Sequence, residues 1–172
     1  LGIIIPTGKD SLSMKQKYQG EEVLSPGTVI ITAAGHCDDI YKIVEPVLKK
    51  EGGALYHLNL SQDSFQLGGS SFAQTRNRVG EKAPTIKDAK FFAKAFDAVQ
   101  EAIKADLIVA GHDVSAGGLL TCLLELCFAD IELGVNVDLT ALGETDSVKV
   151  LFAENSGLVL QAKDEQLESF MA

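Results

Sequence analysis

The 172-residue chain is 46% hydrophobic and carries a net charge of −9, and this hydrophobic fraction is typical of a globular domain with its own core. The acidic balance argues against a nucleic-acid-binding surface, because binding a phosphate backbone requires clustered Lys and Arg side chains. No apolar run is long enough to span a membrane, so neither nucleic acid nor membrane is an expected partner.

The cysteines and the two ends of the sequence bear on the expected location of the chain and on whether it is a fragment. The three cysteines, Cys37, Cys122 and Cys127, form no C-x-x-C pair, so we expect neither a disulfide framework nor a zinc site. The apolar run at residues 1–5 is too short for a signal peptide, which leaves the cytoplasm as the expected location. The sequence begins without Met and stops inside a helix-like pattern, so we interpret it as a fragment of a longer protein.

The first third of the chain combines apolar runs with loops. Residues 3–5 predict a short strand that runs into a polar turn, where Lys9 could line a polar site or belong to an ordinary exposed turn. The glycine spacing around Lys9 does not fit a P-loop. Residues 28–35 are continuously apolar and predict a buried central strand. Apolar residues between Ile40 and Leu48 fall on one helical face and predict a helix that Pro46 kinks or shortens.

The middle of the chain predicts a strand, a turn and a long helix. Residues 54–60 alternate in part between apolar and polar side chains, and we expect His57 to be hydrogen-bonded within this strand's sheet rather than catalytic. The stretch Gly68-Gly69-Ser70 is a second, weak candidate for an anion-binding turn. Residues 87–104 predict an amphipathic helix, whose apolar stripe is Phe92, Ala95, Phe96, Val99 and Ile103.

The most informative stretch is the glycine-rich turn at residues 111–118. An apolar run at residues 107–110 predicts a strand before it, and residues 119–128 predict a helix after it. The start of a helix leaves backbone N–H groups unpaired and favours an anion. Asp113 at this turn would repel a bare phosphate, so a phosphate bridged by Mg²⁺ fits better. The alternative is structural, and the local pattern alone favours it: Asp113 or Ser115 caps the helix, and Gly117 and Gly118 allow close packing.

The last third predicts a buried helix, two strands and two short helices. Residues 119–128 are apolar on two faces, which predicts a helix between two layers and makes Cys122 and Cys127 inert core thiols. Strands are predicted at 135–139 and 157–161, and helices at 146–152 and 163–171. The order of elements predicts an α+β (α/β layered) fold, with one mixed β-sheet packed with helices.

Five motifs, in order, resemble the long form of phosphoribosylformylglycinamidine synthase. Residues 5–14 (IPTGKDSLSM) resemble the stretch PVGKDSMSM of that family, and residues 67–74 (LGGSSFAQ) resemble LGATALAQ. Residues 111–120 (GHDVSAGGLL) resemble its HDRSDGGLL turn. Residues 124–129 (LELCFA) and 151–157 (LFAENSG) are similar to LAEMAFA and LFNEELG.

The resemblance implies a fold like the C-terminal domain of aminoimidazole ribonucleotide synthetase. Residues 1–26 would end a preceding N-terminal synthetase-like domain with its linker, and residues 27–172 would form most of the C-terminal α/β domain of the second repeat. The implied enzyme is a ligase of purine synthesis, which converts formylglycinamide ribonucleotide to the amidine with ATP and glutamine. Implied partners are ATP or ADP, these substrates, and the remaining synthetase and glutaminase domains. The isolated fragment is expected to be inactive.

The resemblance also implies an auxiliary Mg²⁺-nucleotide site. By the matching turn, Asp113 is the expected metal ligand and Ser115 a nucleotide contact, with Gly117, Gly118 and Lys9 as further candidates; no catalytic residue is assigned. Val114 and Ala116 depart from the family pattern, where Arg and Asp stand. The alternatives are a non-catalytic structural nucleotide-binding module and a related synthetase of the same superfamily. Gly8-Lys9-Asp10-Ser11 speaks against the related synthetase.

Overall fold

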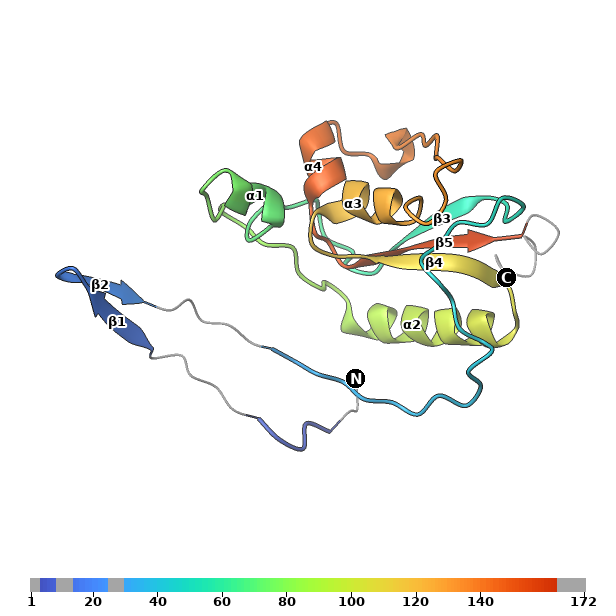
Figure 1. Ribbon diagram of the computed structural model, residues 1–172, viewed down its shortest axis with the longest axis horizontal. Helices are drawn as coiled ribbons and strands as arrows, with labels where there is room; N and C mark the ends of the chain where they lie inside the picture. Colours follow the sequence, from blue (N-terminus) through green and yellow to red (C-terminus); the bar gives the residue numbers. More distant parts are fainter. Residues whose placement is uncertain (1–3, 9–13, 25–29, 164–172) are drawn as a thin grey trace. The chain divides into compact units, whose positions relative to one another are not determined.

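The chain divides after Asp38 into two units in a computed structural model, which describes residues 4–8, 14–24 and 30–163. The first unit contains a hairpin in which β1 (Lys15–Tyr18) pairs antiparallel with β2 (Glu21–Leu24) (Figure 1). Gln19 and Gly20 form its two-residue turn with φ of +50° and +89°, which suits the twist of antiparallel strands. The domain boundary expected between residues 26 and 27 stays a prediction.

The two apolar runs of the first unit form no strand where the structure describes them. Residues 4–5 and 30–35 lie outside regular secondary structure, and Ile30 and Ile31 are 87% and 76% exposed. The predictions of a short strand at residues 3–5 and of a buried central strand at residues 28–35 are therefore wrong for the residues that the structure describes. A strand is buried only where a neighbouring strand supplies hydrogen bonds and a second layer covers its side chains, and the described residues of this unit supply neither.

The second unit is built around a three-stranded sheet. Its order is β3 (Leu55–Asn59), β5 (Gly157–Ala162) and β4 (Ile108–Val114), and both neighbouring pairs are antiparallel. Figure 1 shows α2 (Ala89–Lys104) on one face of the sheet and α3 (Gly118–Glu125), with α4 (Ser147–Phe152) beside it, on the other. The α+β prediction is confirmed.

Both sheet faces carry a core cluster. On the α2 face, buried Val99, Ile108 and Leu160 pack together with Leu58 and Ile103 around them. On the α3 face the cluster is larger and reaches from the sheet into the helix; its buried members are Leu48, Val114, Leu119, Cys122, Leu123, Leu126 and Val159. Burying each such side chain contributes about 1.5–3 kcal/mol, so α3 is held to the sheet mainly by its apolar face.

Helices α2 and α4 form where the sequence predicts them. The Asp88 carboxylate accepts hydrogen bonds from the backbone N–H groups of Lys90 and Phe91, both at 2.9 Å. Asp146 caps α4 in the same way, at 3.0 Å from the N of Val148. Each Asp satisfies N–H groups that the first helical turn leaves unpaired. The predicted strands at 54–60 and 157–161 are likewise confirmed as β3 and β5.

The helix predicted around Ile40 to Leu48 is absent. Pro46 has no N–H to donate within a helix, and the neighbouring backbone groups bond to other elements instead. Glu45 O accepts from Gly111 N at 3.2 Å, and Leu48 N donates to Leu126 O at 3.0 Å. The segment thus runs beside β4 and places Val44 in the α2-face cluster and Leu48 in the α3-face cluster.

The strand predicted at 135–139 is also wrong. These residues have no strand pairing, and a short 3₁₀ helix, η1 (Thr140–Leu142), follows them. Their alternating apolar side chains pack without a strand, since Val135 and Leu139 contact the α3-face cluster. The helix predicted at 163–171 falls almost wholly outside the described residues.

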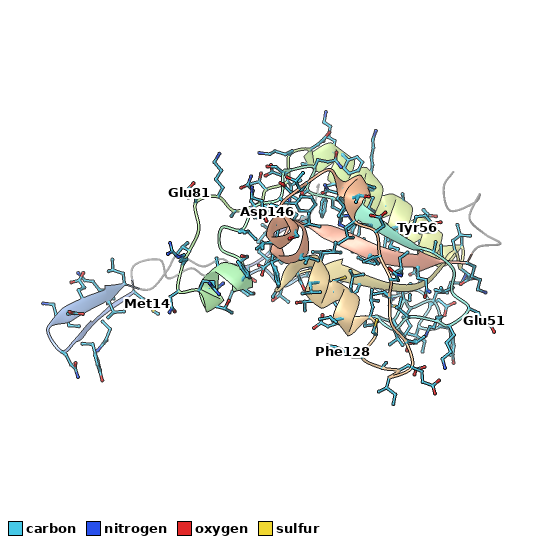
Figure 2. The ribbon with its side chains drawn as sticks, turned by 90° about the horizontal axis from the view of Figure 1, so that it is seen from above. Met14, Glu51, Tyr56, Glu81, Phe128 and Asp146 are labelled. Atoms are coloured by element: carbon cyan, nitrogen blue, oxygen red, sulfur yellow. The ribbon has the colours of Figure 1, made fainter. Side chains whose placement is uncertain are left out.

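Helix α3 is buried on one face, not on two. Phe128, labelled in Figure 2, lies beyond its last turn and is 70% exposed. Leu124 is also exposed. The prediction of a helix between two layers is wrong because no described element covers this second apolar stripe. None of the helices in the described residues has the length and apolar character that crossing a membrane requires.

Candidate functional site

Strand β4 extends through His112 and Asp113 to Val114, beyond the end predicted at residue 110. The Asp113 side chain is 68% exposed, and its Oδ1 lies 3.5 Å from Nδ1 of His112. The His112 ring is largely buried: its Nδ1 lies 2.8 Å from the Asp113 carbonyl oxygen, and its Nε2 lies 3.0 Å from Oε2 of Glu125. The strand therefore presents one accessible carboxylate beside a histidine that is held between two acidic residues.

Asp113 can supply one ligand to a metal ion. Among the residues that the structure describes, no group of three or more His, Cys, Asp and Glu side chains could hold a metal alone. Mg²⁺ is commonly bound through one or two carboxylates, with phosphate oxygens and water completing its shell. An exposed single carboxylate therefore fits a metal that is shared with a bound phosphate, and does not fit an all-protein metal site.

The turn after β4 is short and brings an exposed Ser115 to the start of α3. Gly117 is the N-cap of α3, with φ of +89° and no side-chain cap. The alternative in which Asp113 or Ser115 caps this helix is therefore wrong. Ser115 contributes its carbonyl oxygen instead, which accepts from Gly118 N at 3.0 Å, so its hydroxyl stays available to a ligand on the exposed side of the turn.

The backbone N–H groups of the two glycines already have acceptors within the chain. Gly117 N donates to Oε1 of Glu154 at 2.8 Å, and Gly118 N donates to Ser115 O. A Cβ on Gly118 would lie 2.7 Å from the Leu151 carbonyl oxygen. The close-packing role considered for the glycines is thus present at Gly118, and the predicted nucleotide contacts of Gly117 and Gly118 stay predictions.

The second glycine-rich turn, at residues 68–70, is joined to the first by the carboxylate of Glu154, which bonds to Gly117 in the first and to Ser71 directly after the second. Ser71 N, at the start of α1 (Ser71–Thr75), donates to Oε1 of Glu154 at 2.7 Å. Two other N–H groups of this turn donate to the segment that follows α1, Gly68 N to Lys82 O and Gly69 N to Val79 O, both at 2.6 Å. Every one of these donors is occupied, so the turn as it stands offers them to no phosphate.

Sequence reasoning did not single out Glu154. Glu154 lies within the motif at residues 151–157, which resembles the family and could have drawn attention to it. Its contacts could not be read from the sequence, because Glu154 lies 37 residues from Gly117 and 83 from Ser71. No helical or strand periodicity links positions so far apart in sequence. Lys9, the remaining nucleotide-site candidate, lies outside the described residues.

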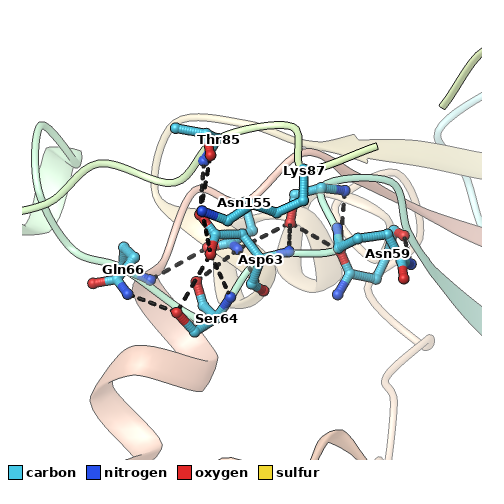
Figure 3. Close-up of polar contacts among 9 residues, drawn as sticks. Asn59, Asp63, Ser64, Gln66, Thr85, Lys87 and Asn155 are labelled. Atoms are coloured by element: carbon cyan, nitrogen blue, oxygen red, sulfur yellow. Dashed lines mark hydrogen bonds and ion pairs between the residues drawn. The ribbon is translucent and has the colours of Figure 1, made fainter. Parts of the chain in front are cut away.

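A polar cluster beside Glu154 fixes the loop before α1 (Figure 3). Buried Asn155 donates through Nδ2 to Ser61 Oγ at 3.0 Å and to Ser64 O at 3.1 Å. Asp63 accepts from the N and Oγ1 of Thr85, and Lys87 Nζ lies 3.4 Å away. Burial opposes the ionisation of Asp63, but hydrogen bonds from the Thr85 and Ser64 N–H groups and the Lys87 charge lower its pKa.

Cys122 is a core thiol, as predicted. Burial, together with the nearby carboxylates of Asp113 and Glu125, raises the pKa of the Cys122 thiol to about 12. A thiol with so high a pKa is no nucleophile at neutral pH. Cys127 is only half-buried, with Sγ 3.3 Å from the Leu123 carbonyl oxygen.

A hollow of about 750 Å³ lies on the α3 face beside β3. His57 lines it, but none of Asp113, Ser115, Gly117 and Gly118 does. The Nδ1 of His57 is buried and has no hydrogen-bond partner within the described residues, so the expectation of a hydrogen-bonded sheet histidine is wrong. Burial disfavours the charged ring and lowers the pKa of His57.

Comparison with known families decides what this fold is. Residues 50–172 match the family described as AIR synthase related protein, C-terminal domain. The chain belongs to this family. The chain is similar to a probable phosphoribosylformylglycinamidine synthase, chloroplastic/mitochondrial, of Arabidopsis thaliana, with 42% identity over 99% of the chain. The human phosphoribosylformylglycinamidine synthase is 41% identical over 97% of the chain. The chain spans about 12% of the length of each of these relatives.

Two solved structures share the fold of this AIR synthase related domain. A structure of PurLQS from Thermotoga maritima aligns over 76% of the chain and 21% of its own, with a TM-score of 0.55 and 18% identity. A structure titled T. maritima PurL complexed with AMPPCP aligns over 76% of the chain and 20% of its own, with a TM-score of 0.52 and 14% identity. At these identities the likeness shows the fold alone.

Proposed function

We propose that the chain is a segment of the ATP-dependent synthetase core of a phosphoribosylformylglycinamidine synthase. The observation that carries this proposal is the similarity over almost the entire chain to enzymes of that name. The whole enzyme would convert formylglycinamide ribonucleotide, glutamine and ATP to the amidine. The other synthetase domains and a glutaminase domain would be its partners, and the proposed location is the cytoplasm.

Within that enzyme, the chain would contribute to an auxiliary Mg²⁺-nucleotide site at the end of β4. Asp113 would be a metal ligand and Ser115 Oγ a phosphate contact, because both side chains are exposed on either side of Val114. Gly117 and Gly118 would shape the turn, and Lys9 is a further proposed contact. Bound Mg²⁺ would neutralise phosphate charge close to the Asp113 carboxylate. The solved PurL structure titled as a complex with AMPPCP supports a nucleotide ligand for this fold.

A structural role for this nucleotide is favoured over a reacting one. Cys122 lies on the helix that follows the turn, and its high pKa makes it unreactive. The His112 ring is held between Asp113 and Glu125 and is largely buried. The described residues around Asp113 offer binding groups for a nucleotide, and the structural role itself rests on the resemblance, which implies an auxiliary nucleotide site.

Calorimetric titration with Mg²⁺-ADP tests this proposal. We expect tight binding to the full-length protein, and weak or absent binding to the 172-residue chain, because the chain supplies one carboxylate and one hydroxyl in a setting open to solvent. Omission of Mg²⁺ should abolish most of the affinity. Micromolar or tighter binding by the chain alone would show that the site is complete here, and absence of binding by the full-length protein would refute the site.

A further inference from the structure

Glu154 joins the two glycine-rich turns through one atom. Its Oε1 accepts from Gly117 N at 2.8 Å and from Ser71 N at 2.7 Å. These short distances are typical of N–H groups that bond to a charged acceptor, which are about twice as strong as neutral hydrogen bonds. One donor stands at the start of the eight-residue α3, where a negative charge is stabilised by the helix dipole.

The residues on both sides of Glu154 are fixed in the core. Ala153 is 2% exposed and Asn155 is 5% exposed, and Asn155 also accepts from Gln66 N at 3.4 Å. The rings of Phe152 and Phe72 stack with their centroids 4.8 Å apart, so the segment before Glu154 contacts α1 as well. The Glu154 carboxylate therefore extends from a segment whose neighbouring residues are buried and packed against α1.

We propose that Glu154 is a positioning residue that sets the conformation of the turn carrying Ser115. This inference rests on the proposed nucleotide site. Because Oε1 already occupies the Gly117 N–H, a phosphate at this turn is held by the metal at Asp113 and by the Ser115 hydroxyl. Loss of the carboxylate releases the start of α3 from α1 and lets Ser115 leave the orientation that a phosphate requires.

The test compares Glu154→Ala and Glu154→Gln in the full-length protein, with Mg²⁺-ADP as the probe. We expect Glu154→Ala to weaken Mg²⁺-ADP binding about tenfold or more, which is a loss of about 1.4 kcal/mol or more in binding free energy. Glu154→Gln should recover most of the affinity, because its amide oxygen can accept from both N–H groups. Hydrogen exchange at the Ser71 and Gly117 amides should accelerate together in Glu154→Ala.

Two variants control for other effects. Glu144→Ala removes a carboxylate whose Oε1 also accepts from two backbone N–H groups, those of Thr145 and Asp146, but within its own loop. Val99→Ala weakens the core on the α2 face of the sheet. Both should leave Mg²⁺-ADP affinity unchanged. Wild-type affinity in Glu154→Ala, or unchanged exchange at both amides, would overturn the inference, whereas a wild-type protein that does not bind Mg²⁺-ADP would refute the proposed function itself.

Discussion

Gly118 lies against the backbone of Phe152, so that a Cβ added to Gly118 would be 2.8 Å from the Phe152 Cα. Its φ is +72°, a conformation that L side chains rarely adopt. Gly118 begins α3 and Phe152 ends α4, so this contact brings the two helices together directly beside the turn that carries Ser115. A glycine is required here by both space and backbone conformation.

Substitution of Gly118 by Ala should destabilise the protein by about 2–4 kcal/mol, from left-handed backbone strain together with overpacking. Gly143 is the matched control, since its φ is +73° and an added Cβ would meet nothing within 4 Å. Gly143→Ala should therefore cost only about 1 kcal/mol. Urea unfolding of both variants measures the difference, and equal losses would show that the contact with Phe152 is not tight.

The three thiols should react with a maleimide in the order of their exposure. Cys37 is exposed, Cys127 is half-buried and Cys122 is buried. With its pKa raised to about 12, Cys122 should be labelled roughly 100-fold or more slowly than Cys37 at pH 8, because only the thiolate reacts. Mass spectrometry of native and urea-unfolded protein follows each site. Native labelling of Cys122 at its unfolded rate would contradict its placement in the core.

Acid should destabilise the protein partly through His57. Its folded pKa lies below the ordinary value of 6.5, so the unfolded state binds the proton first as the pH falls. The stability contributed by the neutral ring is complete above pH 6.5 and is lost as the pH falls from there through the folded pKa. His57→Phe should remove this pH dependence and, by deleting a buried unpaired nitrogen, stabilise by about 1 kcal/mol. Urea unfolding at pH 7.5 and pH 5 checks both effects, and an unchanged pH dependence would argue against the buried neutral ring.

Elements that depend on local signals could be predicted from the sequence. Helix α2 has a regular apolar stripe and a capping Asp88, so its position follows from neighbours a few residues away. Residues 28–35 and 135–139 have strand-like composition, but a strand also needs a partner edge, and that partner is set by distant parts of the chain. The extra length of β4 has the same origin, since His112 and Asp113 pair with Val159 and Leu158 of β5.

The candidate site likewise contains residues that local sequence predicts and residues that it does not. Asp113 and Ser115 lie in one short stretch, so the resemblance of that stretch to a known turn is enough to predict them as site residues. Glu154 reaches the same turn from a distant part of the chain. The unpaired Nδ1 of His57 is likewise a property of packing around β3, and no residue pattern in the strand reports it.

Asp113→Asn in the full-length protein tests the central claim, that Asp113 holds the metal of a structural nucleotide. Asn keeps the size of the side chain and loses the charge that a Mg²⁺ ion needs. A ligand present at about 100 times its Kd stabilises the folded state by about 2.7 kcal/mol, so the variant should lose most of the rise in Tm that Mg²⁺-ADP gives the wild type.

The decisive measurement is Tm, with and without Mg²⁺-ADP, together with turnover on the same preparation. The account predicts that Asp113→Asn loses the nucleotide-dependent rise in Tm while turnover per folded molecule stays within about threefold of wild type, a change below 1 kcal/mol in activation free energy. A turnover that falls by orders of magnitude while the rise in Tm is unchanged would contradict it and make Asp113 a catalytic residue.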